Sequence, residues 1–224
     1  MSWLLYGIVS DDVQLVLEPI MQLIEAAGLA AIVKATETEI SREPAIVMAF
    51  GEQVMRIHQQ TTLIPMRYGS VLSDDDAVTA HLLDNQAHYQ SLLAELENCE
   101  EMGIRITLDS TPEDVITPVQ PISGYDYLLA RKRAYAIPEH AEHQATLLNE
   151  ALAGLFRRNC AAISVFNGRQ TYLLSYLVPR DNLPVFCERL NALAGSMADL
   201  GSISGPWPPY NFASGVICDG RKFN

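Results

Sequence analysis

The dipeptide Asn167-Gly168 lies between two apolar runs, at residues 161–166 and 170–178. Asn and Gly tolerate the left-handed backbone conformation that the tightest hairpin turns require. Asn-Gly between two apolar runs is therefore the strongest short-range signal for a β-hairpin. We expect two antiparallel strands joined by this turn.

The hairpin belongs to a longer order of predicted elements in the second half of the chain. A strand pattern covers residues 104–108, and a helix with an apolar stripe begins at Pro138. After the hairpin, a further helical pattern begins at Leu183, and Ile203 leads into a last extended segment. This order matches a ferredoxin-like β-α-β-β-α-β domain with extra helices inserted after its first strand.

The first half of the chain opens with a strand pattern. Residues 3–9 form an apolar run typical of a buried strand, and residues 29–33 predict a second strand. Pro44 suits the first turn of a helix that reaches about His58.

The segment between those two strands predicts a helix. Apolar residues recur at helical spacing over residues 16–27, and Gly28 fits a helix C-terminus. Pro19 weakens this prediction, because proline is poor inside a helix.

Residues 62–72 are rich in β-forming residues but contain Pro65 and Gly69. Such a strand lies at a sheet edge or carries a bulge. Ser73 can cap the helix that follows, which reaches about Asn98.

Length and composition agree with an α+β protein of two domains. The chain has 224 residues, 49% hydrophobic and 19% charged, which is near the ordinary globular range. We place an N-terminal α+β domain at residues 1–98 and the modified ferredoxin-like domain at residues 103–224. The breaker-rich stretch 109–124 is then an internal loop, followed by a helix-like pattern over 125–135.

The net charge, the lengths of the apolar runs and the N-terminal residues indicate which partners and which location to expect. Asp and Glu number 27 against 15 Lys and Arg, a formal net charge of −12, so we expect no nucleic-acid partner. No apolar run reaches the roughly 20 residues that a membrane span requires, so we expect no lipid-membrane partner. The N-terminus lacks the basic region of a signal peptide, which predicts a cytoplasmic protein.

The sequence contains no recognisable set of catalytic residues, and we predict neither a metal nor a cofactor. The four cysteines form no C-x-x-C motif. His140 and His143 lie one helical turn apart, but they fit a solvated helix face better than a metal site. Residues 201–205 resemble a nucleophile elbow but place Ile203 where the serine should be. Glu100-Glu101 could be half of an acid/base pair, without a partner in sequence.

The most unusual segment is Gly-Pro-Trp-Pro-Pro-Tyr-Asn-Phe, at residues 205–212. Its three prolines hold the chain extended and remove backbone donors. Trp207, Tyr210 and Phe212 then present large rigid apolar surfaces, which can anchor either to their own core or to a partner. Both readings remain open at this point.

This segment closely resembles the C-terminal signature of the gas vesicle protein F/L family (GvpF/GvpL), which reads Gly-Pro-Trp-Pro-Pro-Tyr-Ser-Phe. Only Asn211 departs from it. Residues 5–9 look like the family's opening strand, and residues 63–71 are similar to its Leu-Pro-Leu-Arg-Phe-Gly-Thr-Val motif. Residues 124–132 resemble its Gly-x-x-Tyr-Leu-x-x-Arg-Arg motif. The compact length looks more like the F type.

The resemblance implies an accessory or minor structural protein of gas vesicles, the hollow protein-walled organelles that give aquatic microbes buoyancy. It also implies a two-domain α+β fold, no enzymatic activity, and contact with the major hydrophobic shell protein. Other gas vesicle proteins are further possible partners. The expected location is the gas vesicle within the cytoplasm, with the gas-facing surface of the wall as one possibility. The alternatives are a cytosolic assembly chaperone absent from the mature vesicle, or a ferredoxin-like small-ligand binder or enzyme.

For the surface that contacts the shell protein, we expect Trp207, Tyr210 and Phe212, together with Arg67. Arg67 lies within the 63–71 motif. It could position a partner, or it could pair with an acidic helix of its own chain.

Overall fold

The computed structural model describes residues 2–37, 40–108, 137–166, 169–195 and 200–213. By their contacts these residues form two units. Unit 1 contains the described residues up to Glu101 together with residues 205–213, and unit 2 contains those from Met102 to Ser204. Each unit has its own sheet and helices, which confirms the predicted α+β class. The sequence-based boundary puts residues 205–213 in the second domain, whereas their contacts put them in unit 1.

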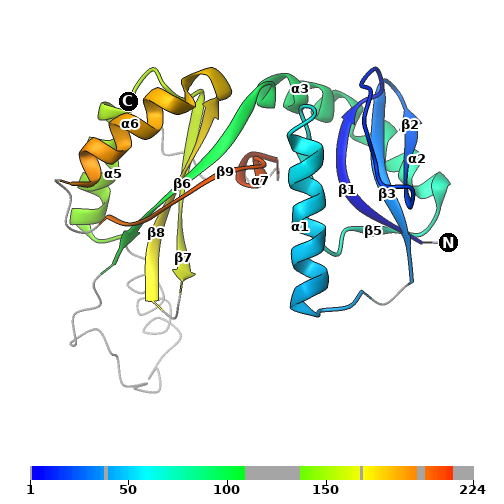
Figure 1. Cartoon of the computed structure of the whole chain (residues 1–224), viewed down its shortest axis with the longest axis horizontal. Helices are drawn as coiled ribbons and strands as arrows, with labels where there is room; N and C mark the ends of the chain where they lie inside the picture. Colours follow the sequence, from blue (N-terminus) through cyan, green and yellow to red (C-terminus); the bar gives the residue numbers. More distant parts are fainter. Residues whose placement is uncertain (1, 38–39, 109–136, 167–168, 196–199, 214–224) are drawn as a thin grey trace, which may run out of the picture. The chain divides into compact units, whose positions relative to one another are not determined.

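Unit 1 is built on an antiparallel sheet with strand order β2-β3-β1-β4, in which β5 also pairs with β1. Helix α1 packs on one face of this sheet and α2 on the other (Figure 1). The strands are β1 (Ser2–Ser10), β2 (Met21–Ala26), β3 (Leu29–Thr36), β4 (Ile64–Pro65) and β5 (Val71–Leu72). The helices are α1 (Pro44–His58), α2 (Asp75–Asp84) and α3 (Gln86–Leu96).

Strand β1 is buried along almost its whole length because helices cover both faces of the sheet. A register shift against β3 between Leu5 and Gly7 adds a bulge. A bulge of one residue reverses which face the following side chains occupy. Leu4 before the bulge, Tyr6 within it and Val9 after it therefore join the same core cluster under α1.

The helix predicted over residues 16–27 is wrong. The structure has β2 there, joined to β3 by a two-residue turn in which Ala27 has φ 57° and Gly28 has φ 78°. Positive φ at both positions is the signature of a type I′ hairpin, so Gly28 serves a strand turn and not a helix end. Pro19 is unfavourable inside a helix. For the residues after it, pairing with β3 outweighs the helical spacing of the apolar residues.

The single helix predicted from Ser73 to Asn98 is two helices separated at Asn85. Its cap is Asp74, not Ser73: Oδ1 of Asp74 accepts a hydrogen bond from the Ala77 amide at 2.8 Å. The Ser73 hydroxyl supports this cap by donating to Oδ2 of Asp74 at 2.9 Å. The backbone hydrogen bond first, and the Ser73 bond second, lower the pKa of the Asp74 carboxyl.

Unit 2 has the strand order β7-β8-β6-β9, which is the order of a ferredoxin-like sheet and agrees with the prediction. Helices α5 and α6 lie on one face of the sheet (Figure 1). The elements are β6 (Cys99–Thr107), α5 (Glu139–Ala151), β7 (Arg158–Phe166), β8 (Arg169–Pro179), η2 (Arg180–Asn182), α6 (Leu183–Ala194), β9 (Leu200–Trp207) and α7 (Tyr210–Ala213). Strand β6 begins in unit 1, and β9 ends there with α7.

The predicted hairpin is present, since β7 and β8 pair antiparallel with Phe166 opposite Arg169. That register leaves two residues for the turn, as expected for Asn167-Gly168, which themselves lie outside the described residues.

The loop predicted over 109–124 and the helix predicted over 125–135 also lie outside the described residues. Among the helices that are described, none is long and apolar enough to cross a bilayer.

We expect Gly7→Ala to destabilise unit 1 by about 2 kcal/mol, because a Cβ there would collide with the Leu63 side chain and lie 2.9 Å from the Ile64 carbonyl oxygen. Gly51→Ala is the control, since a Cβ at that position in α1 meets nothing within 4 Å. It should raise stability by up to about 1 kcal/mol through helix propensity. Urea unfolding followed by tryptophan fluorescence measures both, because Trp3 and Trp207, the two tryptophans, lie in unit 1. Equal midpoints for the two variants would contradict the close packing at Gly7.

Candidate functional site

The C-terminal aromatic segment is anchored in unit 1. Phe212 is buried with 3% of its side chain exposed, and Pro208 and Pro209 before it are buried as well. Tyr210 packs against the core cluster that lies under α1, and α7 contacts β4. The prolines and the buried rings together fix the path of the chain here.

A buried carboxylate holds the same segment by two hydrogen bonds. The backbone amide of Asn211 donates to Oε2 of Glu101 at 2.8 Å, and its side-chain Nδ2 donates to Oε1 at 2.5 Å. Glu101 is only 6% exposed, so these charge-assisted bonds offset the cost of removing its carboxylate from water. Asn211 is the residue that departs from the family signature. Its side-chain amide is the donor of the second bond.

The structure separates the three aromatic residues that the sequence grouped together. Phe212 is core, Tyr210 is partly buried, and the Trp207 indole is 49% exposed. Arg67 is exposed in the turn after β4, where its carbonyl accepts hydrogen bonds from the amide and hydroxyl of Ser70. Its guanidinium makes no ion pair with any described residue. Trp207 and Arg67 are therefore the predicted residues that a partner can reach.

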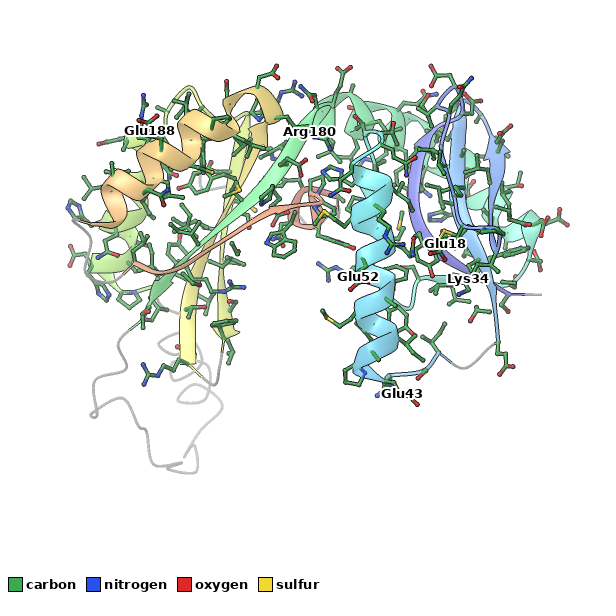
Figure 2. All side chains as sticks on the ribbon, in the orientation of Figure 1. Glu18, Lys34, Glu43, Glu52, Arg180 and Glu188 are labelled. Atoms are coloured by element: carbon green, nitrogen blue, oxygen red, sulfur yellow. The ribbon has the colours of Figure 1, made fainter. Side chains whose placement is uncertain are left out.

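Sequence reasoning missed a second apolar surface, the N-terminal half of α1. Ile46, Val47 and Met48 are 42%, 38% and 65% exposed, and the alanines on either side of them are exposed too. Glu43 lies at the start of this helix and Glu52 farther along it (Figure 2). The sequence signal was present, because a helix that is apolar all round must either be buried or meet a partner.

A pocket of about 520 Å³ adjoins this half of α1 within unit 1. Three aromatic rings build its wall: Phe50 stacks on Tyr6 at 4.4 Å between centroids and meets Tyr68 edge-on at 5.2 Å. Glu18 and Lys34, labelled in Figure 2, also line it. Burial raises the pKa of Tyr6, and the negative charge of Glu18 raises it further. The pocket beside the exposed helix end therefore has a mixed lining of aromatic, aliphatic and charged residues.

The acidic pair Glu100-Glu101 serves two buried contacts and not one shared site. Oε2 of Glu100 lies 2.8 Å from Nε2 of His58, and both side chains are buried. Glu101 holds Asn211 as described. His140 and His143 are exposed on α5, and within the described ranges no group of three or more His, Cys, Asp or Glu is placed to hold a metal ion.

Comparison with known proteins identifies the family. Residues 2–214 match the family described as gas vesicle synthesis protein GvpL/GvpF. The chain belongs to this family. The resemblance inferred from the sequence motifs is thereby confirmed.

Two Streptomyces sp. (strain CB03234) proteins are similar in sequence. Gas vesicle protein F is 26% identical over 216 residues, covering 87% of this chain and 88% of that protein. Gas vesicle protein L is 25% identical over 169 residues, covering 68% and 63%. The F protein is thus matched over the larger share of its length.

Two crystal structures share the fold of this GvpL/GvpF family member. GvpF from Microcystis aeruginosa superposes with a TM-score of 0.72 at 18% identity, covering 95% of this chain and 98% of that one. GvpF from Anabaena sp. PCC7120 gives 0.70 at 17% identity, covering 95% of each chain. At these identities the likeness shows the fold.

Phe212→Ala should destabilise unit 1 by about 3 kcal/mol, because it empties a buried site and loosens the anchored segment. Trp207→Ala should cost less than about 1 kcal/mol, since half of the indole is already in water. Urea unfolding followed by circular dichroism compares the two variants. Circular dichroism is used because its signal does not depend on Trp207, which one variant removes. A large loss for Trp207→Ala would show that this ring is core.

The anchored segment should also become less stable in alkali. Burial raises the pKa of Tyr210 from 10.0 to about 12. The stability that neutral Tyr210 contributes is fully present below pH 10, and it is lost as the pH rises from about 10 to about 12. Tyr210→Phe should weaken this loss, measured as unfolding midpoints at pH 9 to about 12. Unchanged alkaline lability in the variant would exclude Tyr210 as a source.

Proposed function

We propose that this GvpL/GvpF family member is a minor structural component of the gas vesicle wall. In this role it binds the hydrophobic shell protein and supports vesicle assembly. The observation that carries the proposal is the half-exposed Trp207 ring. The segment that carries this ring is anchored by the buried Phe212 side chain and by the hydrogen bonds from Asn211 to Glu101. A rigid aromatic side chain loses little entropy on binding, so it is a favourable anchor for an apolar partner.

The exposed end of α1 supports the same proposal. Ile46, Val47 and Met48 are three consecutive exposed apolar residues in unit 1, the unit that also carries Trp207. Contiguous exposed apolar surface is uncommon unless it meets a partner. Subunits of a gas-filled shell carry large apolar faces before they assemble, which such a surface could cover.

The charge of the chain suits this role. A formal net charge of −12 keeps a protein with exposed apolar residues in solution before it reaches the growing shell. We place the protein at the vesicle within the cytoplasm, with the gas-facing side of the wall as the location to test first.

Washed vesicles decide between wall component and transient chaperone. Intact vesicles are purified from cells that express the chain, washed stringently, and blotted for it with and without collapse. Retention, with protection from added protease until collapse, supports an embedded or gas-facing component. Complete loss on washing overturns the wall proposal in favour of an assembly chaperone, and absence of any association overturns both.

Trp207→Ala should weaken binding to the shell protein by at least about tenfold, the effect expected of a central aromatic anchor. Met48→Ser should weaken it as well, because it makes the exposed end of α1 polar. Leu147→Ala is the matched control, since Leu147 is 45% exposed on α5 in unit 2. Co-purification with tagged shell protein at several concentrations measures all three. Equal binding by all variants would place the contact elsewhere.

A further inference from the structure

A pocket of about 270 Å³ lies in unit 2 and takes residues from all four strands of its sheet. Strand β6 supplies Arg105 and Thr107, β8 supplies Arg169 and Thr171, and β9 supplies Ser202. The pocket is therefore a property of the assembled sheet and not of one loop. It is independent of the surface proposed above for the shell protein, which lies in unit 1.

The alternation of the strands explains why polar residues gather here. Ile104 and Ile106 of β6 and Tyr172 of β8 belong to the core packed against α5 and α6. Arg105 and Thr107, which alternate with Ile104 and Ile106 along β6, must then point to the opposite face of the sheet. No described helix of unit 2 packs on that face.

Among the described residues, the Arg105 side chain is held in this pocket by one contact, and one of its hydrogen-bond donors has no acceptor. Its guanidinium carbon lies 4.5 Å from the centre of the Phe166 ring, a cation–π contact that orients the plane of the group. Its Nε is buried and has no hydrogen-bond partner in the described part of the chain. A buried charged donor without an acceptor is costly, so such a group in a pocket points to a missing acceptor.

Arg169 adds a second uncompensated cation. It is exposed on β8, and neither Arg105 nor Arg169 forms an ion pair with a described residue. None of the described residues that line the pocket is acidic, in a chain where acids outnumber bases 27 to 15. The hydroxyls of Thr107 and Ser202 complete a lining that can donate hydrogen bonds to an anion.

We propose that this pocket binds the phosphate group of a small phosphate monoester. Two guanidinium groups match the charge of about −1.5 to −2 that a phosphate monoester carries near pH 7, whereas a single carboxylate would leave one of them uncompensated. The fork of an arginine also fits phosphate oxygens in a bidentate manner. The pocket volume of about 270 Å³ is below the range of about 300–1000 Å³ typical of drug-sized ligands, and it has room for a phosphate group with a few carbons beside it.

Calorimetric titration of the whole chain with inorganic phosphate and with glycerol phosphate, at low ionic strength, tests the proposal. We expect one site per chain that binds glycerol phosphate at least as tightly as inorganic phosphate. Arg169→Gln should weaken the affinity about tenfold or more, the effect of losing one charged hydrogen bond. Because Arg169 is exposed, this variant should keep its fold, checked by circular dichroism. Arg105→Lys keeps the charge but loses the fork, so it should also weaken binding.

Arg189→Gln is the matched control. It removes the same charge from the exposed surface of α6, the helix that packs on the other face of the sheet. Its affinity should equal that of the unchanged chain. The proposal is overturned by the absence of saturable binding, by undiminished affinity in folded Arg169→Gln, or by an equal loss in Arg189→Gln. Binding of inorganic phosphate alone would overturn the monoester as the ligand.

Discussion

The buried carboxylate of Glu101 is the interaction on which the arrangement of the C-terminal segment depends. A carboxylate with 6% exposure is stable in its charged form only when hydrogen bonds replace its water. Asn211 supplies two of them, one from the backbone and one from the side chain. With Asn211 fixed, Phe212 reaches the core and Trp207 stays half outside it. The half-exposed Trp207 thus lies four residues before the position at which Glu101 holds the segment.

Much of the fold could be predicted because its signals are local. The Asn167-Gly168 turn, Pro44 at the start of α1 and the apolar run of β1 each act within a few residues, and each gave the correct element. The helix predicted over 16–27 failed because the choice between strand and helix there is made by β3, which pairs with it. The spacing of apolar residues within one segment does not show which other strand that segment pairs with.

The candidate site was predictable in its residue types but not in its geometry. The sequence singled out Trp207, Tyr210 and Phe212, yet the segment that carries them is held by Glu101, more than a hundred residues earlier. The exposed end of α1 was missed because an apolar helix looks the same in sequence whether its face is covered or open. Arg105 and Arg169 line the same pocket because β8 is the neighbour of β6 in the sheet. No local sequence motif predicts that strand order.

Within the described residues the chain passes from one unit to the other in two places, once within β6 and once within β9. Glu101 is the last residue of unit 1 before the first passage, and Asn211 follows the second passage by a few residues. Their two hydrogen bonds thus join the ends of both passages inside unit 1. The segment 205–213 also makes apolar contacts with unit 1 through Tyr210 and Phe212. Apolar burial is non-directional, whereas hydrogen bonds to one carboxylate specify a single position. The carboxylate therefore contributes specificity of placement, and the buried rings contribute most of the stability.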